Sequence, residues 1–172
     1  MSIFFENELD KPLPDGYKDI VREIVQAAIE YVDCPYECEV NVIFTNNQGI
    51  EAINNEFRGL KSPTDVLSFP MIDYEKPEDF QGLEDTPWEY FNQDTGELML
   101  GDIVLNVDRI VSQAKEYGHT RSREIAFLTA HSMLHLFGHD HVDDHERLIM
   151  EDKQEQILSM KGYTRDNEQE KI

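Results

Sequence analysis

The sequence has few cysteines, no long apolar run and little positive charge. Its two cysteines, Cys34 and Cys38, are too few for a disulfide scaffold and favour a reducing, cytoplasmic location. No apolar stretch approaches the roughly 18 residues that a membrane helix needs. The first residues also lack the basic and apolar regions of a signal peptide. We therefore expect a cytoplasmic protein without a membrane partner.

Basic residues are scarce, because 15 lysines and arginines stand against 36 aspartates and glutamates, which gives a net charge of −21. This charge excludes diffuse attraction as the main force for binding nucleic acid. Nine of the acids and only one base fall between residues 73 and 97, where no helical or strand period is visible. We interpret this segment as a loop-like acidic insertion within a single domain that spans residues 1–172.

The hydrophobic pattern predicts a mixed α/β chain. Apolar residues recur at helical spacing over residues 17–31, 108–117, 122–137 and 143–160. A shorter helix is predicted to begin at Asn47, whose side chain can cap it. Strands are predicted over residues 39–45, 65–69 and 98–107. The expected fold class is α+β, with one small, mixed or mostly antiparallel sheet and helices packed on it.

Five of the six histidines lie between residues 131 and 145. His131 and His135 are four residues apart on a predicted helix, so their rings share one face and can chelate a divalent ion. Gly138 stands where the helix should end, and its left-handed conformation would reverse the chain and return His141 as a third ligand. Three imidazoles leave a position open for water, which is typical of a catalytic, zincin-like metal site. Core histidines satisfied by hydrogen bonds are the alternative.

The same histidine spacing occurs in the long zinc-protease signature, but Ser132 stands where that signature has its general-base glutamate. A serine hydroxyl cannot take a proton from water near neutral pH without a partner base. Other polar residues of the segment stay open. His139 either supports the site or lies on the surface, and His145 is expected to be solvated. Asp140 either orients a ligand ring, accepts a proton or is an ordinary turn residue.

Three further motifs accompany the histidine cluster: residues 54–58 (Asn-Asn-Glu-Phe-Arg), 62–70 (Ser-Pro-Thr-Asp-Val-Leu-Ser-Phe-Pro) and 100–103 (Leu-Gly-Asp-Ile). Together the four motifs resemble the bacterial YbeY family, which are single-strand-specific endoribonucleases of ribosomal RNA maturation. The three candidate ligands match the usual family pattern. Ser132 and His139 depart from it, since glycine and tyrosine are usual there, and the acidic segment is longer than the family requires.

The resemblance implies a zinc-dependent endoribonuclease in which His131, His135 and His141 hold one ion and Arg58 and His131 are catalytic. Imidazole also suits nickel, copper and iron, so other divalent transition metals stay possible. The guanidinium of Arg58 could bind a phosphate bidentately and stabilise developing charge. The implied partners are single-stranded ribosomal RNA, at the 3′ end of the small-subunit RNA, and the small subunit or its assembly proteins. A role in ribosome quality control is implied as well, and DNA is not an expected partner.

Two other functions stay open at this point. A metalloprotease-like hydrolase is favoured by the ligand spacing and opposed by Ser132. A non-catalytic ribosome-assembly factor would use the metal structurally. Thr64, Asp65 and Ser68 are candidates for the cleft, although each could equally have a purely structural role, such as capping a turn.

Overall fold

One mixed, four-stranded sheet forms the framework of the fold. The computed structural model describes residues 1–164, so the end of the predicted domain, residues 165–172, lies outside the described part. The strands are β1 (Ser2–Asn7), β2 (Cys38–Thr45), β3 (Val66–Pro70) and β4 (Leu98–Asn106). They are ordered β1-β2-β4-β3; β2 is parallel to both β1 and β4, and β3 is antiparallel to β4. The predicted α+β class with a small mixed sheet is confirmed.

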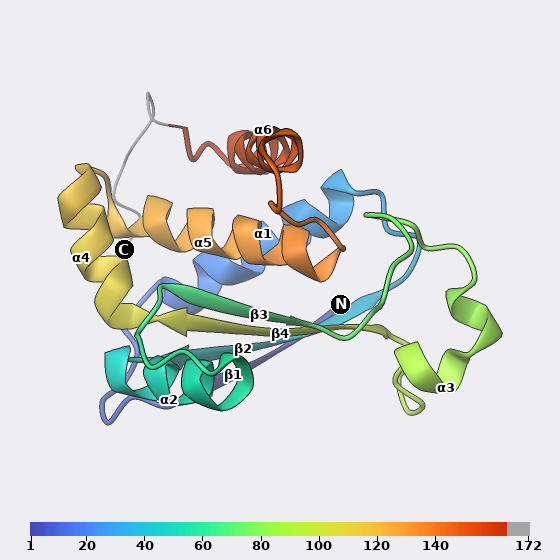
Figure 1. Cartoon of the computed structure of the whole chain (residues 1–172), viewed down its shortest axis with the longest axis horizontal. Coiled ribbons are helices and arrows are strands. Elements are labelled where there is room, and N and C mark those ends of the chain that lie inside the picture. The colour runs from blue at the N-terminus through green and yellow to red at the C-terminus, as the bar shows by residue number, and fades with distance from the viewer. Residues whose placement is uncertain (165–172) are drawn as a thin grey trace.

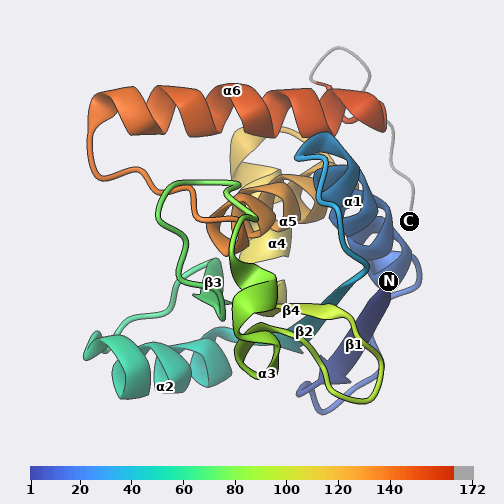
Figure 2. The ribbon, with the colours of Figure 1, turned by 90° about the vertical axis from the view of Figure 1, so that its right-hand side faces the viewer.

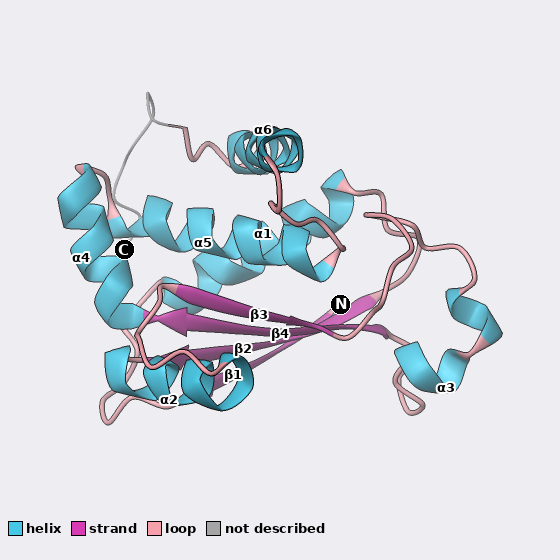
Figure 3. Ribbon diagram, viewed as in Figure 1, coloured by secondary structure: helices cyan, strands magenta, loops and turns pink. Residues whose placement is uncertain are grey.

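Helices cover both faces of the sheet. They are α1 (Tyr17–Tyr31), α2 (Asn47–Arg58), α3 (Pro87–Tyr90), α4 (Val107–Tyr117), α5 (Arg121–Leu136) and α6 (Asp144–Met160), with a 3-10 turn η1 (Leu83–Asp85). Helices α1 and α5 lie over one face, α6 lies outside them, and α2 covers the opposite face (Figure 1). The turned view shows the same layers (Figure 2), and colouring by element separates the sheet from the helices (Figure 3).

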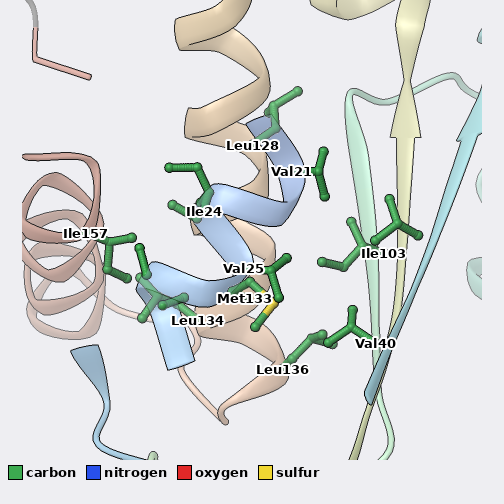
Figure 4. Close-up of a cluster of buried hydrophobic side chains, with 14 of the residues drawn as sticks. Val21, Ile24, Val25, Val40, Ile103, Leu128, Met133, Leu134, Leu136 and Ile157 are labelled. Carbon is green, nitrogen blue, oxygen red and sulfur yellow. The ribbon is translucent and has the colours of Figure 1, made fainter. Parts of the chain in front are cut away.

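Helix α5 lies at the centre of the main core. Of its 16 residues, 12 are buried, so almost every side of the helix contacts protein. Its Leu128 and Met133 lie close to Val21 and Val25 of α1, and Ile103 of β4 faces them from the sheet (Figure 4). A helix that is buried on all sides is held rigidly by packing. The backbone of α5 is therefore a rigid support for the side chains that it carries toward the surface.

Helices α1, α4, α5 and α6 begin and end within about one residue of the predicted positions, and α2 begins where predicted, but three details were wrong or missed. Asn46 caps α2 instead of Asn47, because its Oδ1 atom accepts the Gly49 N–H at 2.9 Å. Strand β1 was not predicted, since its six residues show no alternation that would reveal an edge strand. The acidic segment, expected to be a loop, contains η1 and α3. Among the helices of residues 1–164, none combines the length and apolar character that crossing a bilayer requires.

Gly101 allows β4 and β3 to approach one another closely. Its φ of +136° is a conformation that other residues rarely adopt, and a Cβ atom there would lie 2.2 Å from the carbonyl oxygen of Phe69. Gly101→Ala is expected to lower the free energy of unfolding by about 3 kcal/mol, measured by urea denaturation. Gly59→Ala is the matched control: φ is +68° but a Cβ meets nothing within 4 Å, so the loss should be about 1 kcal/mol. Equal losses would contradict the steric explanation.

Candidate metal centre

The predicted pair of histidines on α5 comes together as the spacing indicated. His131 and His135 lie one turn apart near the end of the helix, and their Nε2 atoms are 3.1 Å from one another. Their ring centroids are 4.7 Å apart and the rings are nearly perpendicular. Since α5 is packed on almost all sides, the backbone positions from which these two side chains extend are fixed by the core.

The end of α5 turns the chain back toward these rings. Gly138 has a φ of +95°, the left-handed conformation that was predicted for it. Its N–H donates to the carbonyl of His135, and the N–H of His139 donates to that of Leu134, both at 3.0 Å. This pair of bonds is the Schellman motif, which ends a helix and reverses the chain.

The reversal returns His141 to the other two histidines. Its ring centroid lies 5.6 Å from that of His131 and 5.2 Å from that of His135. One nitrogen from each ring lies within 4.8 Å of a nitrogen from each of the other two rings. The structure therefore assembles all three predicted ligands; their binding of an ion stays a prediction.

Hydrogen bonds to the outer ring nitrogens fix which nitrogen faces the centre. The Nδ1 atom of His135 lies 2.9 Å from the carbonyl oxygen of His139. The Nδ1 atom of His131 lies 3.3 Å from the side-chain oxygen Oε1 of Gln154. Because carbonyl oxygens only accept hydrogen bonds, each Nδ1 carries the hydrogen and each Nε2 presents a lone pair. Such outer contacts are typical of metal-binding histidines.

The geometry fits a divalent transition ion. Two lone pairs 3.1 Å apart repel one another unless a cation or a proton lies between them. A tetrahedral zinc ion with bonds of about 2.0–2.1 Å places two ligand nitrogens about 3.3 Å apart, close to the observed separation. The residues present are therefore suited to hold zinc, and His131, His135 and His141 are the ones that would bind it.

Burial keeps two of these rings neutral. It lowers the pKa of His131 below its ordinary value, and it lowers the pKa of His135 to about 4, with repulsion from His131 adding to the effect. Neutral imidazole is the form that binds a metal, so both rings are ready to act as ligands near pH 7.

The same pKa shifts predict that acid destabilises the metal-free protein. Because the pKa of His135 is about 4 in the folded state and about 6.5 when unfolded, the unfolded chain binds more protons between these values. The contribution of neutral His135 to the free energy of unfolding is thus fully present above pH 6.5 and is lost as the pH falls toward 4. Between pH 7 and pH 5, the free energy of unfolding of the native chain should fall by about 1 kcal/mol more than that of His135→Gln, after allowance for solvent screening. Thermal unfolding with a chelator measures this, and parallel pH profiles would contradict it.

A cleft of about 820 Å³ opens above the histidines and brings most of the predicted site residues together. Its lining includes Arg58, Thr64, Asp65, Ser68 and Asp140 besides the three histidines. Arg58, the last residue of α2, is exposed, and within residues 1–164 it forms no ion pair or hydrogen bond. Its guanidinium is thus available to an anion in the cleft.

The structure also places the residues whose roles were open. The carboxylate of Asp140 accepts the backbone N–H of His141 at 2.8 Å and so steadies that ligand's backbone. Ser132 is fully buried, and its Oγ lies 2.5 Å from Oγ of Ser68, so it cannot replace a general-base glutamate. His145 is exposed on α6, as expected. His139 is only 7% exposed and contacts Glu78, so it is not a surface residue.

Two contributors to the site carry no signal in the sequence. Gln154 reaches His131 from α6, and Glu78 reaches His139 from the acidic segment. These contacts span 23 and 61 residues respectively, so only the tertiary fold reveals them.

Comparison with known proteins identifies the family of the chain. Residues 4–162 match the family described as Endoribonuclease YbeY. The Endoribonuclease YbeY of Agathobacter rectalis is 50% identical over 165 residues, covering 96% of this chain and 100% of that protein. The Endoribonuclease YbeY of Lachnoclostridium phytofermentans is 48% identical over 158 residues, covering 92% of this chain and 96% of that protein. A solution structure of TM1509 from Thermotoga maritima shares the fold, with a TM-score of 0.52, 21% identity and coverage of 92% and 90%. The chain therefore belongs to the YbeY endoribonuclease family.

Proposed function

We propose that this protein is a zinc-dependent, single-strand-specific endoribonuclease that acts in maturation of the 3′ end of small-subunit ribosomal RNA and in ribosome quality control. One observation carries the proposal: three histidine nitrogens converge at the base of an open cleft that a free arginine also lines. The family of the chain supports cleavage of RNA, and the paired hydrogen bonds to the outer ring nitrogens support a bound metal.

The proposed chemistry divides between the ion and the chain. His131, His135 and His141 would hold the zinc ion, which would supply a nucleophile or proton acceptor at neutral pH by lowering the pKa of water to about 7. His131 and His135 hold their lone pairs toward the centre because Gln154 and the His139 carbonyl bind the opposite side of each ring. Arg58 binds the phosphate and stabilises the charge that develops on its oxygens.

The charge of the cleft explains how an acidic protein can accept RNA. Among the lining residues, Arg58 is opposed by Asp65, Asp73 and Asp140. A divalent ion would bring the formal charge of this set to zero at the place where a phosphate must lie. Because the whole chain carries −21, binding to arbitrary RNA should nonetheless be weak.

Weak general binding implies delivery by a partner. We infer that the small ribosomal subunit or an assembly protein presents the RNA, and that neither DNA nor a membrane is a partner.

We further propose that residues 1–172 form a single domain that works in the cytoplasm. The presence of only two cysteines, Cys34 and Cys38, supports a reducing location.

A cleavage assay tests this function against the alternatives. The zinc-loaded protein is incubated with labelled single-stranded RNA, with the same RNA as a duplex, and with casein. Cleavage of the single strand alone, stopped by a chelator, is the expected result. Casein cleavage would support the protease-like hydrolase, which the buried Ser132 disfavours. Full zinc occupancy with no turnover of any polymer would support the non-catalytic assembly factor.

A further inference from the structure

The first part of the acidic segment packs directly across the end of α5. The N–H of Glu78 donates to the carbonyl of Phe137 at 2.8 Å, and the ring of Phe80 lies edge-on to that of Phe137 at 5.9 Å. At Gly138, an added Cβ would lie 3.0 Å from the Tyr74 ring and 3.3 Å from Pro77. The segment is therefore fitted closely to the turn that returns His141.

The side chain of Glu78 joins three parts of the fold at this place. Its carboxylate accepts hydrogen bonds from Nε2 of His139, in the turn after α5, and from Nζ of Lys153 on α6 at 2.6 Å. Burial raises the pKa of Glu78, but the hydrogen bonds from Lys153 and His139 outweigh it and lower the pKa below its ordinary value. The carboxylate is thus ionised at neutral pH and binds both donors strongly.

Two further features of these residues point to a role beyond packing. Glu78 has a φ of +63°, a left-handed conformation that a residue other than glycine adopts only at some cost. Residues held in such conformations gather at functional sites. His139 itself is 7% exposed, and its backbone carbonyl is the acceptor for Nδ1–H of His135. The same residue, His139, therefore carries both the contact with Glu78 and the carbonyl that orients a predicted ligand.

We propose that Glu78 is a positioning residue of the metal centre: by holding the His139 ring, it fixes the His139 carbonyl, which in turn fixes the ring of His135. The proposal rests on the metal site of the proposed function. It joins two features that depart from the usual family pattern, the histidine at position 139 and the long acidic segment. The segment thus contributes directly to the site instead of serving only as a surface loop.

Zinc affinity tests the proposal with a matched pair of variants. Glu78→Gln is compared with Glu75→Gln, which removes the same charge from an exposed position three residues away. In competition with a chromophoric chelator for Zn²⁺, Glu78→Gln should bind about 10-fold to 100-fold more weakly than the native chain, as loss of an orienting contact does. Glu75→Gln should match the native chain. If all three proteins bind zinc measurably and with equal affinity, the proposal is overturned.

A double-mutant cycle tests the route through His139. If the effect passes through that ring, Glu78→Gln should change zinc affinity little in a His139→Phe background. An undiminished effect in that background would overturn the route. Thermal unfolding of each variant with a chelator present separates a general loss of folding from a local change.

Imidazole nitrogen NMR of the metal-free proteins distinguishes this inference from the proposed function. In the native chain His135 should be the Nδ1–H tautomer, and in Glu78→Gln a mixture of tautomers should appear. An unchanged tautomer would overturn the positioning role. If the tautomer shifts but no protein binds zinc or cleaves RNA, the positioning role of Glu78 on His135 stands and the proposed function falls.

Discussion

His131→Ala is expected to abolish RNA cleavage and to weaken zinc binding by more than about 100-fold. Loss of a residue that merely orients a ligand already costs roughly 10-fold to 100-fold in affinity. His131 would lose more, because its Nε2 lies 3.1 Å from that of His135 and would be a ligand itself. Its removal leaves two imidazoles, one of them on an exposed turn. Metal analysis after dialysis, together with cleavage of single-stranded RNA, measures both effects.

His145→Ala is the matched control for this prediction. The residue belongs to the same histidine-rich segment but is exposed on α6 and lies outside the cluster. We expect it to retain zinc and activity. A His131→Ala protein that keeps one zinc per chain would show that these three histidines are not the metal site, and loss of zinc without loss of cleavage would remove the metal from the mechanism.

Arg58→Ala is expected to lower the rate of RNA cleavage by about 100-fold to 1000-fold while zinc affinity stays unchanged. Removing one preformed donor to a developing oxyanion has an effect of this size. Arg58 lines the cleft but is not one of the clustered ligands, so the metal should be unaffected. Arg58→Lys should recover only part of the rate, because lysine keeps the charge and loses the bidentate geometry. Single-turnover kinetics with zinc-loaded protein measures the chemical step.

Arg121→Ala controls for the change in net charge. Arg121 is exposed at the start of α5, ten residues from His131 and thus about 15 Å along the helix. If Arg121→Ala slowed cleavage as much as Arg58→Ala, the effect of Arg58 would be one of overall charge and not of contact with the phosphate. Unchanged cleavage by Arg58→Ala would remove this residue from the site.

Local patterns predicted those parts of the molecule that depend on local interactions. The apolar pattern of residues 17–31 predicted the bounds of α1, because the buried positions of an amphipathic helix recur every three or four residues. The spacing of His131 and His135 and the turn at Gly138 are likewise determined within a few residues. Strand β1 was missed because its pairing with β2 crosses more than thirty residues and its own pattern is weak.

The support of the site was beyond prediction for the same physical reason. Nothing near Gln154 indicates that its amide meets His131, and nothing in the acidic segment marks Glu78 among its nine acids. Such contacts depend on how α6 and the segment fold over α5, which a single sequence does not specify. The error of one residue at the cap of α2 has another cause, since two neighbouring asparagines are equally suited to the role.

The division of the histidines between a buried helix and an exposed turn has a consequence for the kinetics of ion exchange. His131 and His135 lie on α5, whose amides should exchange with solvent only when the whole protein unfolds. His141 is exposed on a turn that can open locally at much lower free energy. We therefore expect an ion to be released and captured when His141 moves away while His131 and His135 stay in place. We therefore predict that the lifetime of a bound ion depends on local opening of that turn and not on global stability.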